Sequence, residues 1–293
     1  MLSLIIAHRE KSPEGPTPPF SHVSDYAPFY EVDAHWEPGD DGRNVRSIRD
    51  AHARLGRRVF NTHIRHDMLP PPPPAGGLYK VIYVVRSGPD VCWSFYNHLS
   101  NQVEGKYTGS FQDFVGEMCA GTLPYGKWTD HVLSFLGALS SDDDRRRAEP
   151  PTEMLLLSYE GMVGDISSSV RRIVRFLDLD VDDDQVEALL PKFTFRGMVK
   201  DLDKFQPRSV GWTGGFRFLR KGVVGDGEEH MRNLIWTENG DGDDGQHNEA
   251  VTVLDKFVQW SKSELFLERL EEILLRCNSE VRDDVENTLA WMC

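Results

Sequence analysis

The sequence predicts an α/β fold, in which helices cover both faces of a central parallel sheet. Two short apolar runs, at 79–85 and 153–160, have the length and composition of buried strands. They alternate with segments of helical periodicity such as 166–179, where apolar residues recur at positions 166, 170, 173, 174 and 177. The chain shows no internal repeat, and residues 1–293 are expected to form one domain.

The first quarter of the chain is expected to hold short elements separated by turns. In order, these are the end of a helix at 1–9, a proline-rich connector at 11–25, a helix at 45–56 and a short strand at 57–63. His63 stands near the exit of that strand. The run at 69–77, LPPPPPAGG, is interpreted as a stiff surface connector, with a ligand for a proline-binding module as the alternative.

The rest of the chain follows the alternation of strands and helices. The expected order is a strand at 79–85 with a helix directly after it, helices within 110–121 and 126–140, a charged tip at 141–151, a strand at 153–160, a helix at 166–179, a helix and turn at 182–201, a glycine-rich stretch at 211–230, an acidic loop at 236–250 and helices over 250–293.

Composition excludes several classes of protein. The formal net charge of -14 argues against broad binding to nucleic acid or to an anionic membrane, so an anionic ligand needs a local basic pocket. The four cysteines show no CxxC spacing, which indicates neither a metal site nor a disulfide framework. The apolar start, MLSLIIA, is too short for a membrane span. We therefore expect a cytoplasmic protein.

Arg86 directly follows the strand at 79–85, at the position where open α/β sheets bind ligands. Asp90 is expected to cap the next helix, which would place Ser94 in the first turn, where free amides and the helix dipole favour an anion. Arg86 and Ser94 could then hold one phosphate. A structural ion pair is the alternative interpretation of Arg86.

A second basic element is the RKG sequence of Arg220, Lys221 and Gly222. Glycine permits close backbone approach and the two cations supply charge-assisted hydrogen bonds, so this segment could bind the same phosphate. The alternative is an ordinary solvated loop. The occurrence of Arg86 at a strand end and of the RKG segment further along the chain, in this order, indicates a phosphate site more strongly than either feature alone.

Three further features lie near predicted strand ends or turns. His63 is a candidate general base, with a structural histidine as the alternative. Tyr159 ends the second strand, and the segment FTFRGM offers Thr194, Phe195 and Met198 to a planar ring. Each of these residues taken singly is more often found in core or rim packing.

With these motifs in place, the sequence resembles the cytosolic sulfotransferases, which transfer a sulfuryl group from 3′-phosphoadenosine 5′-phosphosulfate (PAPS) to a hydroxyl or amine. The resemblance covers roughly residues 26 to 230. The matching segments are APFYEV, RVFNTHIRHDMLP, KVIYVVRSGPDVCWSFYNH, LPYGKWTDHV, LLLSYEGM, VRRIVRFLDL, FTFRGM and FLRKGVVGD.

The resemblance implies a three-layer fold like that of P-loop NTPases and a role for each candidate residue. His63 resembles the catalytic base that takes the proton of the acceptor. The residues that resemble binders of the 3′-phosphate are Arg86, Ser94, Arg220, Lys221 and Gly222. Those that resemble the adenosine pocket are Tyr159, Thr194, Phe195, Met198 and Phe218. The implied partners are PAPS and a small phenol, alcohol or amine, without a metal.

Departures from the family pattern limit these implications. The PKSGTT-type phosphate loop and the strand before it are absent from the sequence, and MLSLIIA could be the tail of the helix that follows that loop. A lysine that often stands two residues before the catalytic histidine is Asn61, and the tryptophan expected after GD is Gly227. The usual dimerisation motif is unrecognisable, so no dimer is inferred.

Three hypotheses follow from the sequence. The first is a sulfotransferase whose sequence is N-terminally incomplete and which is weakly active or inactive as written. The second is a non-catalytic relative that binds a nucleotide or small molecule. The third is a nucleotide or small-molecule kinase of similar α/β architecture, and the lack of a lysine-bearing phosphate loop in the sequence counts against it.

Overall fold

The computed structural model describes residues 1–10, 21–31, 43–70, 79–140, 152–237, 251–263 and 266–289. The chain falls into two compact units. The histidine unit, which contains His63, comprises Met1–Ile64, Gln102–Glu104 and Gly161–Gly222; the sheet unit comprises Arg65–Asn101, Gly105–Glu160 and Val223–Cys293. That these units form one domain stays a prediction.

Several predicted connectors fall largely or wholly outside the described residues. They are most of the proline-rich connectors at 11–25 and 69–77, the whole charged tip at 141–151 and all but the first two residues of the acidic loop at 236–250. Within the described residues, no helix combines the length and apolar character that crossing a membrane requires.

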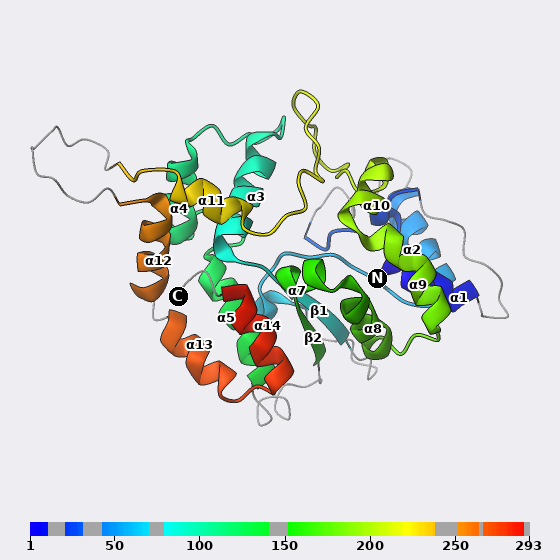
Figure 1. The fold of residues 1–293 in the computed structure, drawn as a ribbon. Helices are drawn as coiled ribbons and strands as arrows, with labels where there is room; N and C mark the ends of the chain where they lie inside the picture. The colour runs from blue at the N-terminus through cyan, green and yellow to red at the C-terminus, as the bar shows by residue number, and fades with distance from the viewer. Residues whose placement is uncertain are drawn as a thin grey trace, which may run out of the picture. The chain divides into compact units, whose positions relative to one another are not determined.

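A parallel pair of strands forms the centre of the sheet unit (Figure 1). Strand β1 spans Tyr79–Val85 and β2 spans Thr152–Ser158, paired so that Val85 lies opposite Ser158. This register confirms the predicted parallel α/β sheet, which has two strands within the described residues. Both strands therefore end at the same edge of the sheet.

Helices of the sheet unit lie between and after the strands. In chain order they are α3 (Gly88–Ser100), α4 (Phe111–Ala120), α5 (Trp128–Ser140), α11 (Asp226–Arg232), α12 (Val253–Ser263), α13 (Phe266–Leu274) and α14 (Ser279–Leu289), with the short 3-10 helix η3 (His66–Met68) before β1. The helices predicted after Arg86, within 110–121 and 126–140, and over the C-terminal region are confirmed. Helix α14 contacts β2, and α13 contacts α5.

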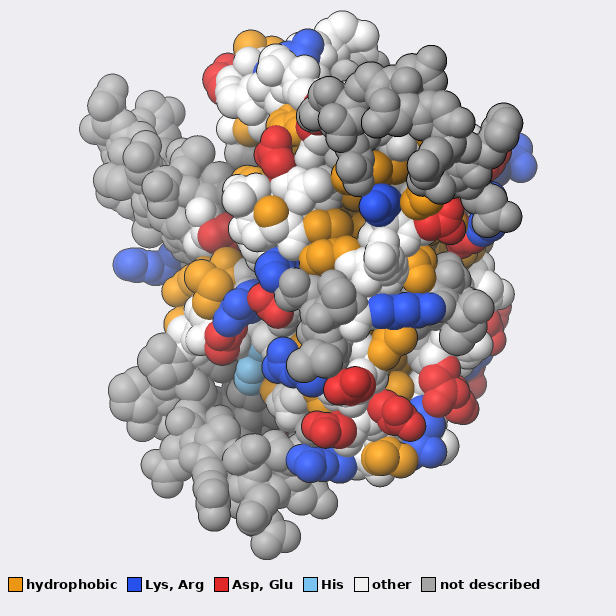
Figure 2. All heavy atoms as spheres, turned by 90° about the vertical axis from the view of Figure 1, so that its left-hand side faces the viewer, with side chains coloured by type: hydrophobic (Ala, Val, Ile, Leu, Met, Phe, Trp, Pro, Cys, Tyr) orange, Lys and Arg blue, Asp and Glu red, His pale blue; other side chains and the backbone are white. Residues whose placement is uncertain are grey.

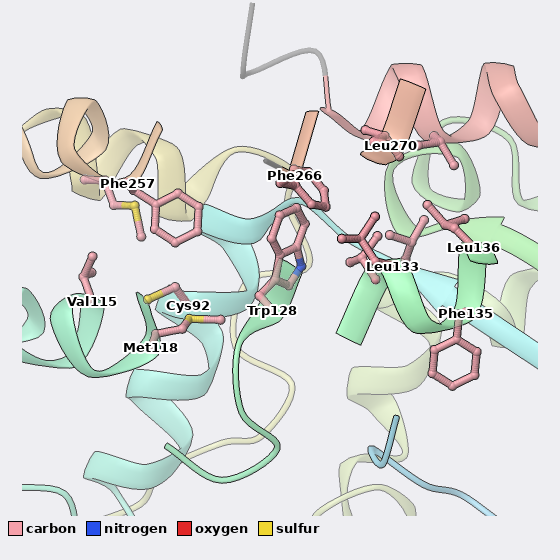
Figure 3. Packing of buried hydrophobic residues seen from close by; sticks show 14 of the residues in the cluster. Cys92, Val115, Met118, Trp128, Leu133, Phe135, Leu136, Phe257, Phe266 and Leu270 are labelled. Atoms are coloured by element: carbon pink, nitrogen blue, oxygen red, sulfur yellow. The ribbon is translucent and has the colours of Figure 1, made fainter. Parts of the chain in front are cut away.

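The hydrophobic core of the sheet unit includes side chains of β1 and α5 and of the C-terminal helices α12 and α13. Alternate residues of β1 enter it, because Tyr83 and Val85 are buried whereas Val84 is exposed. Trp128 of α5 lies next to Phe257 and Phe266 (Figure 3), with ring centroids 6.4 and 5.3 Å away. Helices α12 and α13 are thus integral to the core around the sheet.

The histidine unit is mainly helical. Its elements are α1 (Leu2–Glu10), η1 (Val23–Asp25), α2 (Arg43–Leu55), α8 (Ile166–Phe176), α9 (Asp183–Phe193), α10 (Phe195–Lys200) and η4 (Leu202–Lys204). Helix α2 ends at Leu55, directly before the predicted end at Gly56, whose φ of 65° is easily reached without a side chain. Helix α7 (Tyr159–Gly164) begins in the sheet unit and ends in this one.

The strand predicted at 57–63 is wrong. Phe29 and Asn61 form a single parallel bridge instead, in which Tyr30 N–H donates to Asn61 O (2.8 Å) and Asn61 N–H donates to Pro28 O (2.9 Å). The apolar pattern misled because Phe60 remains exposed rather than entering a core. A side chain without a buried face does not support an extended ladder.

Truncating Phe257 should test the importance of the C-terminal helices for the core. The Phe257 side chain is fully buried, so Phe257→Ala removes a ring from a packed site and should lower the free energy of unfolding by about 3–5 kcal/mol. Urea unfolding followed by circular dichroism measures this loss. The matched control, Leu275→Ala, removes a side chain from the surface and should change stability little; equal losses would contradict the proposed core.

Candidate functional site

Arg86 and Tyr159 meet at the carboxyl edge of the sheet. Arg86 follows the last residue of β1 and Tyr159 follows the last residue of β2, and the register sets those last residues opposite each other. The Arg86 guanidinium carbon lies 4.2 Å from the centroid of the Tyr159 ring, a cation–π arrangement. Two residues 73 positions apart in sequence, both predicted as site residues, are therefore brought together.

Arg86 also takes part in the ion pair that the sequence left as its alternative role. Its Nη2 lies 3.3 Å from Asp90 Oδ2 and donates to the Val223 carbonyl at 3.4 Å. The Trp128 indole N–H donates to the Arg86 carbonyl at 3.2 Å. The buried Nε of Arg86 has no hydrogen-bond partner among the described residues, so the hydrogen-bonding capacity of the guanidinium is incompletely used.

The predicted helix cap at Asp90 is wrong. Helix α3 begins at Gly88, because Pro89 is suited to a first turn, and Asp90 lies inside that turn. Ser94 consequently lies in the second turn, where it is exposed and where backbone amides are already paired within the helix. Ser94 can therefore offer its hydroxyl to an anion, but not the first-turn position that the sequence predicted.

Asp90 holds the start of α11 instead. Its fully buried carboxylate accepts hydrogen bonds from the backbone N–H groups of Gly225 (3.0 Å) and Gly227 (2.7 Å), besides pairing with Arg86. A Cβ at residue 227 would lie 2.1 Å from the Pro89 carbonyl oxygen, which explains why glycine stands where the family pattern has tryptophan. An indole supplied by α3 lies nearby, because Trp93 Nε1 donates to Asp226 at 2.9 Å.

Glu160 is a further, half-buried carboxyl at this edge that the sequence did not single out. Its Oε1 accepts a hydrogen bond from the Ser87 backbone N–H at 3.0 Å. Burial raises the pKa of Glu160 above its usual value, although that hydrogen bond and the nearby charge of Arg86 act in the opposite direction. Glu160 therefore braces the turn between β1 and α3.

In the histidine unit, His63 is paired with a carboxylate that sequence reasoning missed. Glu31 Oε1 accepts a hydrogen bond from the His63 backbone N–H at 2.7 Å and lies 3.2 Å from His63 Nδ1. Burial alone would raise the pKa of Glu31, but the hydrogen bonds from His63, together with those from the Glu31 backbone and Thr62, outweigh it and lower that pKa to about 2. In the sequence, the only indication of this partner was Glu31 itself, the acidic residue of APFYEV, three positions after Pro28.

The predicted ring-binding segment packs against the RKG segment within the histidine unit. Thr194 caps α10 by accepting from Gly197 N–H at 3.0 Å, and Phe195 and Met198 are half-buried on that helix. Gly222 has a φ of 65°, and a Cβ there would lie 2.2 Å from the Phe195 ring. The backbone at residue 222 thus touches an aromatic face that only glycine allows.

The remaining basic and aromatic candidates of this unit are exposed. Arg220, Lys221 and Phe218 have exposed side chains, and the Phe218 backbone N–H donates to Gln206 Oε1 at 2.9 Å. Within each unit, therefore, the predicted residues gather into a cluster: Arg86 with Tyr159 in the sheet unit, and Phe195 with Gly222 in the histidine unit. That the two clusters form one nucleotide site stays a prediction.

Charges of both signs are mixed on one face of the described residues (Figure 2). On the face drawn in Figure 2, basic and acidic side chains of the described residues are interspersed rather than separated into large patches of one sign. Across the described part of the chain, no group of three or more His, Cys, Asp and Glu side chains is placed to hold a metal ion.

Comparison with known proteins shows which family shares these features. The profile of the sulfotransferase domain matches residues 1–237. Among curated relatives, a luciferin sulfotransferase of Photinus pyralis is 28% identical over 192 residues, covering 64% of this chain and 48% of that protein. An amine sulfotransferase of Oryctolagus cuniculus is 29% identical over 198 residues, covering 64% and 60%. The match thus spans about half to three fifths of these relatives.

Solved structures share the fold at low sequence identity. A mouse sulfotransferase complexed with PAP has a TM-score of 0.51 at 24% identity, covering 80% of this chain and 70% of that one. A retinol dehydratase in complex with androsterone and PAP has a TM-score of 0.53 at 20% identity, covering 84% and 63%. At these identities the likeness concerns the fold.

The contact between Gly222 and Phe195 can be tested by matched glycine substitutions. Gly215→Ala places a methyl group at a φ of 77° in open space and should lower the free energy of unfolding by about 1–2 kcal/mol. Gly222→Ala adds a clash with the ring to a similar φ, so it should lose roughly a further 1–3 kcal/mol. Equal urea midpoints for the two variants would contradict the close packing.

Proposed function

The chain belongs to the sulfotransferase domain family, and on that basis we propose that it transfers a sulfuryl group from PAPS to a hydroxyl or amine of a small organic acceptor. The relatives' names include luciferin, amine and 3-beta-hydroxysteroid sulfotransferases, which supports a small-molecule acceptor. Both solved relatives described above hold PAP, the product that PAPS leaves, which supports the donor. We further propose a cytoplasmic location.

The observation that carries the proposal is the meeting of Arg86 and Tyr159 beyond the ends of two parallel strands. This edge is where open α/β folds bind ligands, and a guanidinium stacked on a phenol combines a phosphate donor with a surface for a planar base. The Asp90 carboxylate holds the guanidinium from one side. A phosphate oxygen could take up the donor capacity that remains.

The cluster in the histidine unit supplies complementary chemistry. We propose that Phe195, Met198 and Phe218, with Tyr159 and Thr194, line the adenosine site, and that Arg220, Lys221 and Gly222 join Arg86 and Ser94 at the 3′-phosphate. Gly222 supports this assignment because its backbone already lies against Phe195, so a phosphate bound there would be close to an aromatic face. The exposed cations beside it supply charge-assisted hydrogen bonds.

His63 is the proposed base. As the acceptor oxygen bonds to sulfur and the bond from sulfur to the bridging phosphate oxygen breaks, the acceptor proton passes to the imidazole and PAP leaves. Transfers through loose in-line transition states depend mainly on positioning and charge stabilisation. A general base contributes on the order of 100- to 10,000-fold.

A non-catalytic nucleotide-binding protein is the second candidate. One observation favours it: the 293 residues contain no PKSGTT-type loop, the segment that supplies backbone donors to the 5′-phosphosulfate in the family pattern. Removing a single preorganised donor lowers turnover by about 100- to 1,000-fold. Binding and transfer must therefore be measured separately.

Calorimetry with adenosine 3′,5′-bisphosphate tests the binding site. We expect the 293-residue chain to bind this nucleotide and Arg86→Ala to weaken binding at least about 10-fold, because a charge-assisted hydrogen bond is lost. Arg171→Ala is the control. Arg171 of α8 pairs with Asp183 and Glu187 of α9, so this variant should change affinity less than about two-fold. Equal affinities for wild type and Arg86→Ala would remove Arg86 from the site.

Transfer from labelled PAPS to a panel of phenols, alcohols and amines tests the reaction. We expect turnover by the 293-residue chain to be at least about 100-fold below that of a family member with an intact phosphate loop. Residual transfer should be lost in His63→Ala and kept in His8→Ala, which alters an imidazole of the same unit that accepts from the Asp180 backbone N–H. Nucleotide binding without any transfer would favour the non-catalytic alternative.

A further inference from the structure

The bridge between two segments places Glu31 beside His63. Phe29 and Asn61 form a parallel bridge between their segments. Asn61 N–H donates to Pro28 O, and Tyr30 N–H donates to Asn61 O. Two positions beyond the bridge partners Phe29 and Asn61, the backbone pairing is replaced by a side-chain contact, in which the Glu31 carboxylate accepts a hydrogen bond from the His63 backbone N–H. The partner of His63 is therefore set by backbone register.

A single carboxylate oxygen contacts both the backbone and the ring of His63. Glu31 Oε1 lies 2.7 Å from the backbone nitrogen and 3.2 Å from Nδ1. Because the two His63 atoms belong to one residue, their shared acceptor restricts rotation of the side chain relative to its own backbone. The Phe29 ring adds a second restriction, stacked on the imidazole at 5.2 Å between centroids and 16° between planes.

The charge of Glu31 determines which ring nitrogen carries the proton. The side chain is only 16% exposed, whereas the His63 side chain is 53% exposed. A carboxylate with a pKa near 2 is ionised at neutral pH and can only accept hydrogen bonds. Nδ1 of a neutral His63 must then carry the proton, which leaves the lone pair on Nε2.

We propose that Glu31 is a positioning residue that holds His63 in its Nδ1–H tautomer and presents the Nε2 lone pair to the acceptor hydroxyl. The last part of this inference rests on the proposed function. When Nε2 takes the proton of the acceptor, the ring becomes an imidazolium, and the adjacent Glu31 carboxylate stabilises that charge without itself becoming protonated.

Nuclear magnetic resonance of the full 293-residue chain tests the tautomer without any need for turnover. With 15N-labelled histidine, long-range proton–nitrogen correlations at neutral pH distinguish a pyrrole-type from a pyridine-type nitrogen, and the spectrum of His63→Gln assigns His63 among the ten histidines. We expect a pyrrole-type Nδ1 and a pyridine-type Nε2. The opposite pattern in the wild-type chain would overturn the proposal.

Two variants separate the role of the Glu31 charge from general structure. In Glu31→Gln the isosteric carboxamide can donate or accept, so we expect loss of the single Nδ1–H pattern in favour of a mixture of tautomers. Glu104→Ala is the matched control, because Glu104 Oε2 likewise accepts a backbone N–H in this unit, that of Gly211 at 3.0 Å. It should leave the His63 pattern unchanged. An unaltered pattern in Glu31→Gln would overturn the proposal.

Kinetics then connect the tautomer to the reaction. If the wild-type chain transfers sulfuryl groups, Glu31→Gln should lower kcat roughly 10- to 100-fold with little change in KM for the donor, as for other residues that orient a functional histidine. An unchanged kcat in a variant whose tautomer is altered would refute the positioning role. Should Glu31→Gln fail to fold, Glu31→Ala, which removes the carboxylate entirely, takes its place, with the same loss of the single Nδ1–H pattern expected.

The outcomes also separate this inference from the proposed function. If the chain shows the Glu31-dependent Nδ1–H pattern but transfers no sulfuryl group to any acceptor, the pairing of Glu31 with His63 stands and the enzymatic function fails. If transfer occurs and depends on His63 while the tautomer is indifferent to Glu31, the function stands and this inference fails.

Discussion

The fully buried carboxylate of Asp90 is the interaction on which the sheet unit's ligand edge depends. A buried carboxylate is strongly unfavourable unless its oxygens are paired, and here they accept two backbone N–H groups and face a guanidinium. Because the two N–H groups belong to Gly225, the residue before α11, and to Gly227 in its first turn, the same carboxylate fixes both where that helix begins and where Arg86 points. Gly227 belongs to this arrangement, since a side chain there would separate α11 from Pro89.

The histidine unit applies the same physical rule on a smaller scale. Glu31, like Asp90, is a carboxylate withdrawn from solvent whose charge is matched by backbone and side-chain donors rather than by bulk water. Such a group is restrained in position, because moving it would leave a charge or a donor unpaired. In both units a carboxylate orients a candidate site residue: Asp90 orients Arg86, and Glu31 orients His63. The family resemblance had assigned neither carboxylate to the site.

Local sequence patterns predicted most of the secondary structure. The apolar runs of β1 and β2 were identified because buried parallel strands leave a continuous apolar signal, and α8 because its apolar residues recur at helical spacing. The failures lie where local signals compete. The apolar residues near 59 indicated a strand, but Phe60 stays exposed and only one bridge forms. Asp90 was interpreted as a cap, although the helix already begins two residues earlier, at Gly88.

The sequence by itself determined the family, the parallel α/β class and the identity of candidate residues such as His63, Arg86 and Gly222, because these depend on composition and spacing along the chain. Only the tertiary structure decided their partners. Glu31 and His63 are 32 positions apart, and Asp90 and Gly227 are 137 positions apart. Hydrogen bonds between such residues depend on register and helix docking, and the burial that makes these carboxylates structurally important exists only once the chain is folded.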